Sequence, residues 1–385
     1  MRGELLVVGE GENPPRDWDA SVLLADQARS QRNATPWRAE AIRLLRDEWP
    51  GPGRLVVFTG SPPLTDYRGD TAHAYADVVI RRTSGNGPTP GEAWTAGHDS
   101  GRIVIDLLPS GDASSYETTA GAVTAALAHL GAGARRTGAE RQVPLAIWGT
   151  GGFQRWYAAQ RATGNTMLAA RPVWSFRVGA ERRLLFYWAL HVAVHVAAED
   201  RVKSNEVVIS RPDIAVVVLY AQGARAALDD VAIVLVREYR AAASSPGAYV
   251  HELPGGSGTR PDDPRSLAIR ELHEETGLLL DPGRLRAHGS RQLVASMSCH
   301  HAHLYSAEIT AAELDLIRSL AGTSYGIEAD TERTWPEVTT FRRIRTEGLV
   351  DWATLGLVAQ ALTDRFAARA EVTRTAPDDE GSCRG

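Results

Sequence analysis

The stretch from Gly256 to Leu278 constrains this chain more than any other. It reads G-S-G-T-R-P-D-D-P-R-S-L-A-I-R-E-L-H-E-E-T-G-L. Asp263 followed by Pro264 predicts the start of a helix, because an acidic side chain can cap free N–H groups and proline suits the first helical position. Gly277 predicts its end, because glycine adopts the left-handed conformation at low cost.

Charged side chains gather on this predicted helix. Glu271 and Glu275 are four residues apart and share a face, and Arg270 and Glu274 are also four apart and can pair. An adjoining apolar stripe would anchor the helix to a core: Ala268, Ile269 and Leu272. Carboxylates this close repel one another unless a cation lies between them. Oxygen ligands suit Mg²⁺ or Mn²⁺, which also bind phosphate oxygens, although a solvated acidic face is the alternative interpretation.

The whole pattern resembles the Nudix box: a glycine, five residues, an acid, seven residues, then R-E-U-x-E-E-x-G-U with U aliphatic. Only Asp262 departs, because the family usually has Glu there. The resemblance implies an α/β/α sandwich with a mixed sheet and metal-assisted hydrolysis of a pyrophosphate linked to a nucleoside. It implies metal binding by the Gly255 carbonyl, Glu271 and Glu275. The catalytic candidates in the box are Arg270, Glu271, Glu274 and Glu275.

The flanking segments resemble the ADP-ribose pyrophosphatase branch of that family. The sequence R-E-Y-R at 237–240 stands where that branch has a Q-Y-R-like motif, and E-L-P-G at 252–255 precedes the box. The resemblance places Arg240 and Glu252 near the substrate and makes ADP-ribose the leading substrate class. The catalytic base is expected on a late loop, where Glu328 and Glu332 are the candidates and Glu332 is favoured over Glu328. A solvated loop acid is the alternative for either residue.

Short aliphatic runs at 5–9, 55–59, 76–80 and 103–108, with helical character at 37–49, predict an open α/β sheet in the first part of the chain.

The motifs W-R-A at Trp37, D-Y at Asp66, A-D at Asp77 and G-E-A-W around Glu92 resemble the nucleoside 2-deoxyribosyltransferase superfamily in their order. The resemblance implies a Rossmann-like domain in which Trp37, Asp66 and Asp77 bind substrate. Glu92 would attack the anomeric carbon. Trp94 departs from the usual Gly and the family's nearby catalytic Asp is missing, so a domain that only binds a nucleotide or another subunit is the alternative.

Two histidine clusters invite a metal interpretation that the spacing disfavours. In 186–196, apolar residues alternate with His191 and His195, which is the period of a strand. The polar segment 199–204 and residues 205–210 would complete a hairpin, which the Nudix relatives often use for dimerisation. His300, His301 and His303 lie near Cys299 and are read as a late strand, because zinc needs better-spaced ligands.

Composition sets broader limits. The 385 residues suffice for two or three domains, and the net charge of −5 gives no sign of a nucleic-acid binder. Two cysteines and no long apolar run favour a cytoplasmic protein without a membrane segment. We expect a deoxyribosyltransferase-like domain at 1–140, a linker at 141–164, a Nudix domain with a leading hairpin at 165–366, and a disordered tail at 367–385.

The sequence therefore predicts a Mg²⁺-dependent Nudix hydrolase that cleaves an ADP-ribose-like nucleoside diphosphate derivative to a nucleoside monophosphate, acting as a homodimer through the Nudix domain. Two alternatives stay open. One is a bifunctional enzyme whose first domain also cleaves the N-glycosidic bond of a nucleotide. The other is a binding protein that senses a nucleotide without turning it over.

Overall fold

A computed structural model describes residues 4–9, 17–18, 20–26, 35–48, 54–58, 77–82, 103–107, 123, 127, 136–178, 184–222, 227–258, 263–326 and 333–375. The chain is a mixed α/β protein that divides into two compact units. The first comprises Met1–Pro212 with Ala295–Cys299, and the second comprises Asp213–Val294 with His300–Gly385. The division therefore falls after Pro212, whereas the sequence suggested a boundary near residue 165.

A five-stranded parallel sheet opens the first unit, in the order β1-β4-β3-β5-β6. Its strands are β1 (Glu4–Val8), β3 (Ala20–Asp26), β4 (Arg54–Phe58), β5 (Val78–Arg82) and β6 (Ile103–Leu107). Helix α1 (Thr35–Glu48) packs Ala41 and Leu45 against buried strand residues such as Val22, Val57 and Ile80. The four aliphatic runs read as strands are confirmed.

A three-stranded antiparallel sheet follows in the same unit, in the order β10-β9-β8. Its strands are β8 (Thr166–Val178), β9 (Leu184–Val196) and β10 (Arg201–Ser210). One face packs Trp188 against Phe153 of helix α5 (Gly151–Ala162), with a T-shaped ring contact at 6.2 Å between centroids. The segment expected as a linker at 141–164 thus carries α5 and the short helix α4 (Leu145–Trp148).

The second unit is built on a seven-stranded mixed sheet with the central order β13-β12-β11-β16-β15. Its strands are β11 (Ile214–Ala221), β12 (Ala232–Tyr239), β13 (Tyr249–Glu252), β14 (Gly255–Ser257), β15 (Arg286–Gln292), β16 (His301–Glu308) and β17 (Thr334–Thr340). Strands β11 and β16 run parallel, β14 pairs with β11, and β17 pairs with β12.

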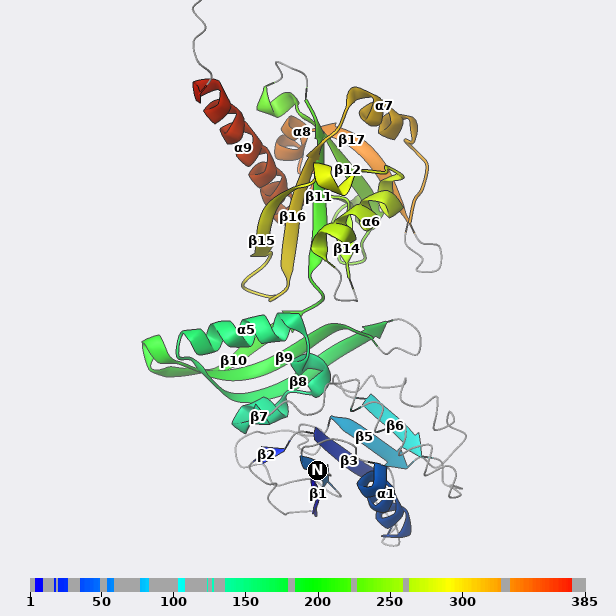
Figure 1. The fold of residues 1–385 in the computed structure, drawn as a ribbon, viewed down its shortest axis with the longest axis vertical. Helices are drawn as coiled ribbons and strands as arrows, with labels where there is room; N and C mark the ends of the chain where they lie inside the picture. The colour runs from blue at the N-terminus through cyan, green and yellow to red at the C-terminus, as the bar shows by residue number, and fades with distance from the viewer. Residues whose placement is uncertain are drawn as a thin grey trace, which may run out of the picture. The chain divides into compact units, whose positions relative to one another are not determined.

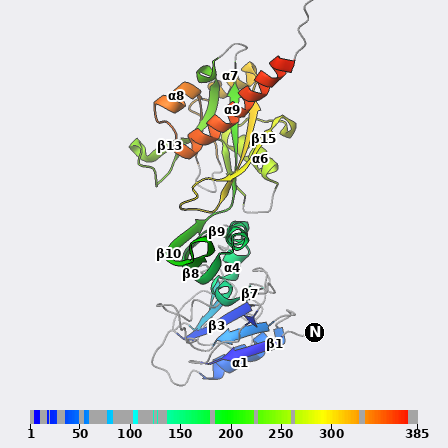
Figure 2. The ribbon, with the colours of Figure 1, turned by 90° about the vertical axis from the view of Figure 1, so that its left-hand side faces the viewer.

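Helices cover both faces of this sheet (Figures 1 and 2). Helices α6 (Pro264–Thr276) and α7 (Ala311–Ser319) pack on the face that carries Val217 and Leu219. Helices α8 (Phe341–Thr346) and α9 (Trp352–Thr375) pack on the opposite face, with Val216 and Val218. Helix α9 extends to Thr375, which corrects the expected start of a disordered tail at residue 367. In the part of the chain that the structure describes, no helix has the length and apolarity to cross a membrane.

Candidate functional site

Helix α6 forms as its sequence predicts. The Asp263 carboxylate accepts a hydrogen bond from the Ser266 N–H at 3.2 Å, and Pro264 occupies the first turn. Gly277 ends the helix with a φ of 69°, and its N–H donates to the His273 carbonyl at 2.9 Å. Three side chains anchor the helix to the sheet and are almost fully buried: Leu267, Ala268 and Leu272. The apolar stripe therefore fixes which face of α6 is left for its carboxylates.

Glu275 joins α6 to the strand that precedes it. Its Oε2 accepts a hydrogen bond from the Gly255 N–H at 2.8 Å, and the residue is only 8% exposed. Strand β14 is held in place because Gly255 pairs with Val216 of β11. The alternative of a solvated acidic face does not hold for Glu275, because the Gly255 amide and the packing of α6 on β14 enclose its carboxylate.

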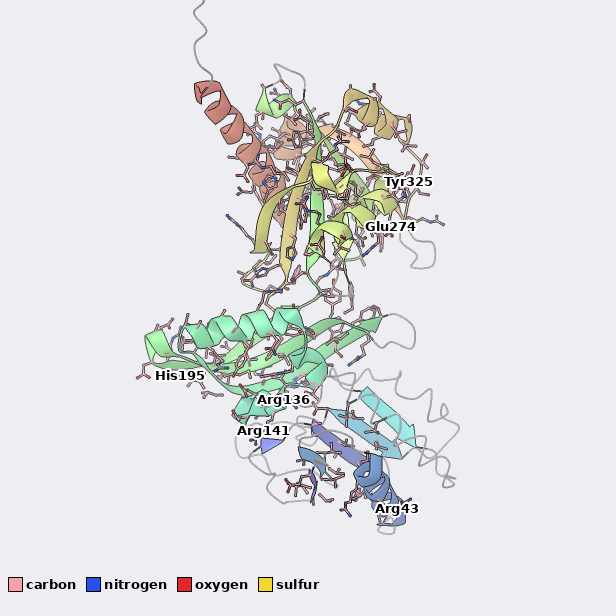
Figure 3. All side chains as sticks on the ribbon, in the orientation of Figure 1. Arg43, Arg136, Arg141, His195, Glu274 and Tyr325 are labelled. Atoms are coloured by element: carbon pink, nitrogen blue, oxygen red, sulfur yellow. The ribbon has the colours of Figure 1, made fainter. Side chains whose placement is uncertain are left out.

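Glu271 lies one turn earlier, against Gly256. A Cβ atom built on Gly256 would collide with the Glu271 carboxylate, so only glycine lets the two groups approach. The Glu271 side chain is 19% exposed, and its Oε1 lies 3.5 Å from Arg270 Nη2. Glu274 also lies on α6 and is partly exposed (Figure 3). The spacing suggested an Arg270–Glu274 pair, and the structure places the guanidinium beside Glu271.

The structure thus brings together Gly255, Glu271 and Glu275, the three residues that the resemblance implies as metal ligands. Their donors are carboxylate and carbonyl oxygens, which fit a hard divalent cation such as Mg²⁺ or Mn²⁺. Across the described residues, no group of three or more His, Cys, Asp or Glu side chains is placed to hold a metal ion. The implied set has two carboxylates and one backbone carbonyl, so it does not require such a group.

Arg240 lies between two carboxylates. Its Nη2 is 2.8 Å from Glu238 Oε2 and 2.8 Å from Glu252 Oε2. Glu252 lies opposite Val236 in the β12–β13 ladder, so Glu238, Arg240 and Glu252 belong to the face of the sheet on which α6 packs. Arg240 and Glu252 were expected from the sequence and Glu238 was not, although its place two residues before Arg240, at the end of a strand, was a usable signal.

Several candidates fall outside the described residues. Asp262, Glu328 and Glu332 lie in the gaps at 259–262 and 327–332, and Asp66 and Glu92 lie in earlier gaps. Trp37 is placed within α1 by its backbone alone.

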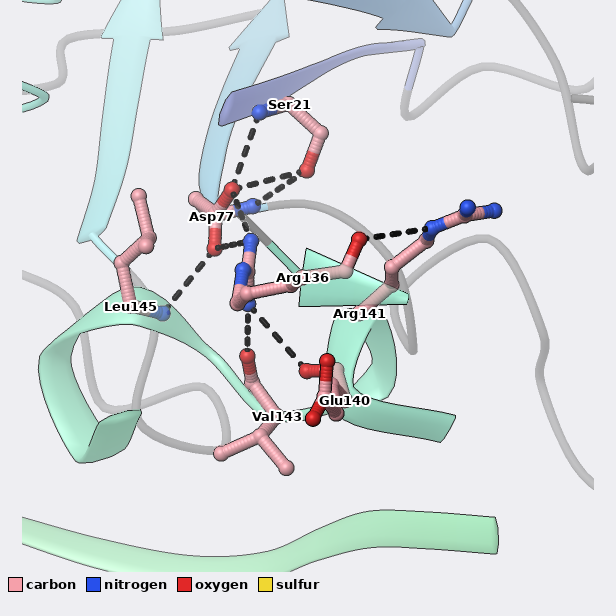
Figure 4. A network of polar contacts seen from close by, with 7 residues as sticks. All are labelled: Ser21, Asp77, Arg136, Glu140, Arg141, Val143 and Leu145. Atoms are coloured by element: carbon pink, nitrogen blue, oxygen red, sulfur yellow. Dashed lines mark hydrogen bonds and ion pairs between the residues drawn. The ribbon is translucent and has the colours of Figure 1, made fainter. Parts of the chain in front are cut away.

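Asp77, expected to bind substrate, is committed to protein groups (Figure 4). It is 1% exposed, and its carboxylate accepts hydrogen bonds from the Ser21 N–H at 2.9 Å and the Leu145 N–H at 2.9 Å. Arg136 Nη2 pairs with it at 3.2 Å, while Nη1 of the same arginine donates to the Val143 carbonyl. Asp77 therefore joins β3 and β5 to the segment that leads into α4.

Four histidines of the two clusters lie on strands, and His300 directly precedes β16. His191 and His195 belong to β9, and His195 Nε2 lies 3.1 Å from Asp200 (Figure 3). His301 and His303 belong to β16, where the His301 N–H donates to Asp213 at 2.9 Å.

No family model and no curated protein matches this chain. Two solved structures show a weak likeness. The T. brucei MERS1–RNA complex matches at 19% identity with a TM-score of 0.22, over 26% of this chain and 35% of that one. Shewanella oneidensis NrtR in complex with a 27mer DNA matches at 16% identity with a TM-score of 0.30, over 41% of this chain and 63% of that one. This chain therefore spans less than two thirds of either.

Proposed function

We propose that the second unit is a Nudix pyrophosphohydrolase that cleaves a nucleoside diphosphate derivative of the ADP-ribose type, releasing a nucleoside monophosphate. The observation that carries this proposal is the placement of Glu271 and Glu275 against the Gly255–Gly256 backbone. The mixed sheet between α6 and α7 on one face and α8 and α9 on the other also supports a sandwich of the Nudix type.

Each residue has a distinct task in this proposal. Glu271, Glu275 and the Gly255 carbonyl would hold Mg²⁺ or Mn²⁺, which when bound supplies charge neutralisation at the pyrophosphate oxygens. Glu275 is oriented by the Gly255 N–H, so its second oxygen is presented in one direction. Arg240 contacts the substrate and Glu252 lies near it, Arg270 orients Glu271, and Glu274 adds to the acidic field. Glu332 accepts the proton of the attacking water.

A nucleotide panel tests this function. The purified protein is incubated with Mg²⁺ and sugar-, alcohol- and nucleoside-linked nucleoside diphosphates, and the products are resolved by mass. We expect at least one to yield a nucleoside monophosphate and a second phosphorylated product. Glu347→Gln is the control for the loss of a glutamate carboxylate. Like Glu271, Glu347 pairs with an arginine, in this case Arg343 of α8. Binding without any turnover across the panel would replace the hydrolase by the nucleotide-sensing alternative.

We further propose that the chain forms a homodimer through the outer face of the three-stranded sheet. Trp174, Phe176 and Val207 on that sheet are 50%, 43% and 48% exposed. They lie opposite Ala189, Tyr187 and His191 of β9, on the face away from α5, so a second copy of the chain would cover an apolar surface there. Sedimentation of the wild-type protein and Val207→Lys tests this, and a wild-type monomer at micromolar concentration would overturn it.

A further inference from the structure

Arg240, the residue that follows β12, is held by one carboxylate of β12 and one of the neighbouring strand β13. Glu238 of β12 and Glu252 of β13 each place an Oε2 atom 2.8 Å from the same nitrogen, Nη2 of Arg240. Glu252 also accepts from Arg240 Nε at 3.3 Å. We call this arrangement of Glu238, Glu252 and Arg240 the carboxylate clamp.

The two arms of the clamp differ in burial. The Glu238 side chain is 7% exposed, while that of Glu252 is 37% exposed. Glu238 is confined because β12 pairs with β13 on one side and β17 on the other at this position, opposite Val250 and Thr334. Glu252 is the last residue of β13 and has room to move. One arm is therefore fixed and the other is exchangeable.

The charge of the clamp shows what could take the place of the exchangeable arm. Two carboxylates around one guanidinium leave an excess of negative charge, so a further anion is repelled until one carboxylate withdraws. A guanidinium binds phosphate with the same planar fork that binds a carboxylate. A phosphate can therefore replace Glu252 on Arg240 while Glu238 keeps the guanidinium in place.

We infer that Glu238 is a positioning residue that orients Arg240 toward a phosphate of the substrate, and that Glu252 is a competing anion which this phosphate displaces. The inference rests on the proposed function only for the identity of the substrate as a nucleoside diphosphate derivative. It deepens that function by assigning opposite effects to two glutamates that contact the same atom.

The test compares two chemically identical substitutions. Binding of inorganic pyrophosphate is measured by titration calorimetry without metal for the wild type, Glu238→Gln and Glu252→Gln. We expect Glu252→Gln to tighten binding about threefold or more, because the competitor loses its charge. We expect Glu238→Gln to weaken it about tenfold or more, because Arg240 loses its fixed anchor. If only electrostatic repulsion mattered, both variants would bind more tightly, and that result would overturn the inference.

Two further variants separate this effect from misfolding. Arg240→Lys keeps the charge but lacks the planar fork, so it should weaken binding as Glu238→Gln does. Glu337→Gln is the matched control, because Glu337 pairs with Arg237, which points to the other face of β12, and its pyrophosphate affinity should equal that of the wild type. Thermal melting of each variant reports whether it is folded at the assay temperature.

The outcomes distinguish this inference from the proposed function. Pyrophosphate binding with the two opposite effects, but no hydrolysis of any nucleotide, would keep the clamp and overturn the hydrolase. Hydrolysis of a nucleotide with both variants shifted in the same direction would keep the hydrolase and overturn the clamp. A wild-type protein that does not bind pyrophosphate would also overturn the clamp.

Discussion

Glu275 on helix α6 accepts a hydrogen bond from the Gly255 N–H at 2.8 Å, across 20 positions of the sequence. This bond fixes the helix against the β14 strand and gives the candidate metal site its geometry. The bond uses the backbone amide of Gly255, and the lack of a side chain at this position leaves room for β11. The two adjacent glycines therefore give two different predictions.

Gly256→Ala should lower turnover with little loss of stability. Its Cβ would collide with the end of the flexible Glu271 side chain, which can swing away, but would then leave its place at the site. We expect a fall of at least about tenfold in kcat/KM, equivalent to about 1.4 kcal/mol. Steady-state kinetics and thermal melting measured on one preparation check this. Unchanged turnover would show that the position of Glu271 against Gly256 is not needed.

Gly255→Ala should instead destabilise the second unit. Its Cβ would meet the Ala215 carbonyl and the Val216 Cα, which are backbone atoms of β11 and cannot move without breaking the ladder. We expect a loss of about 1–3 kcal/mol, as for other overpacked positions. Amide hydrogen exchange in β11 and β14 measures it locally. Exchange as slow as in the wild type would contradict the crowding that the structure shows here.

Asp77→Asn should destabilise the first unit, because it leaves Arg136 buried without its counter-charge. Both residues are almost fully buried, at 1% and 0% exposed. Breaking such a pair costs about 3–5 kcal/mol, which amide exchange in β3 and β5 should report as faster opening. Asp200→Asn is the control, because that carboxylate is 97% exposed beside His195 and its loss should leave exchange unchanged. Equal exchange in Asp77→Asn and the wild type would reopen a substrate-binding role for Asp77.

Glu313 should make the second unit sensitive to acid. A hydrogen bond from Arg284, with help from the Thr310 amide and hydroxyl, lowers the pKa of the Glu313 carboxyl from 4.5 to about 2. A depressed pKa in the folded state stabilises the fold above about pH 4.5, and this contribution is lost as the pH falls toward 2. Glu313→Gln should therefore melt below the wild type at pH 6, and the difference should shrink as the pH falls to 2.

The same scan should be run on Arg284→Gln, which removes the partner that contributes most to the shift. In that background the additional effect of Glu313→Gln should be much smaller at every pH. A Glu313 effect that stays constant from pH 6 to pH 2 would show that the ion pair is not the cause.

Helix α6 could be predicted from the sequence because its signals are local. Asp263, Pro264 and Gly277 determine where it begins and ends, and Leu272 and its neighbours determine its buried face. The strand character of β9 was equally accessible, because apolar residues alternate with His191 and His195 in its second half. Such features depend on residues a few positions apart and need no knowledge of the tertiary fold.

Features that depend on distant pairing could not be predicted. The burial of Glu275 depends on β14 reaching Gly255 against it, and the place of Asp77 depends on Arg136, which is 59 residues away. Strand β3 was missed although it lies between β4 and β5 in the parallel sheet and, at seven residues, is longer than the five-residue strands that were predicted there. The end of the first unit after Pro212 was missed because α5 packs on the β8–β10 sheet, a contact that the composition of 141–164 does not reveal.

The most direct test of the central claim is the Mg²⁺-dependent hydrolysis of ADP-ribose by the wild type, Glu271→Gln and Glu347→Gln, followed as release of nucleoside monophosphate. We predict turnover by the wild type and by Glu347→Gln, and a loss of at least about 100-fold, or about 2.7 kcal/mol, in folded Glu271→Gln. Glu271→Gln that hydrolyses ADP-ribose as fast as the wild type would show that the carboxylates of α6 are not the catalytic site.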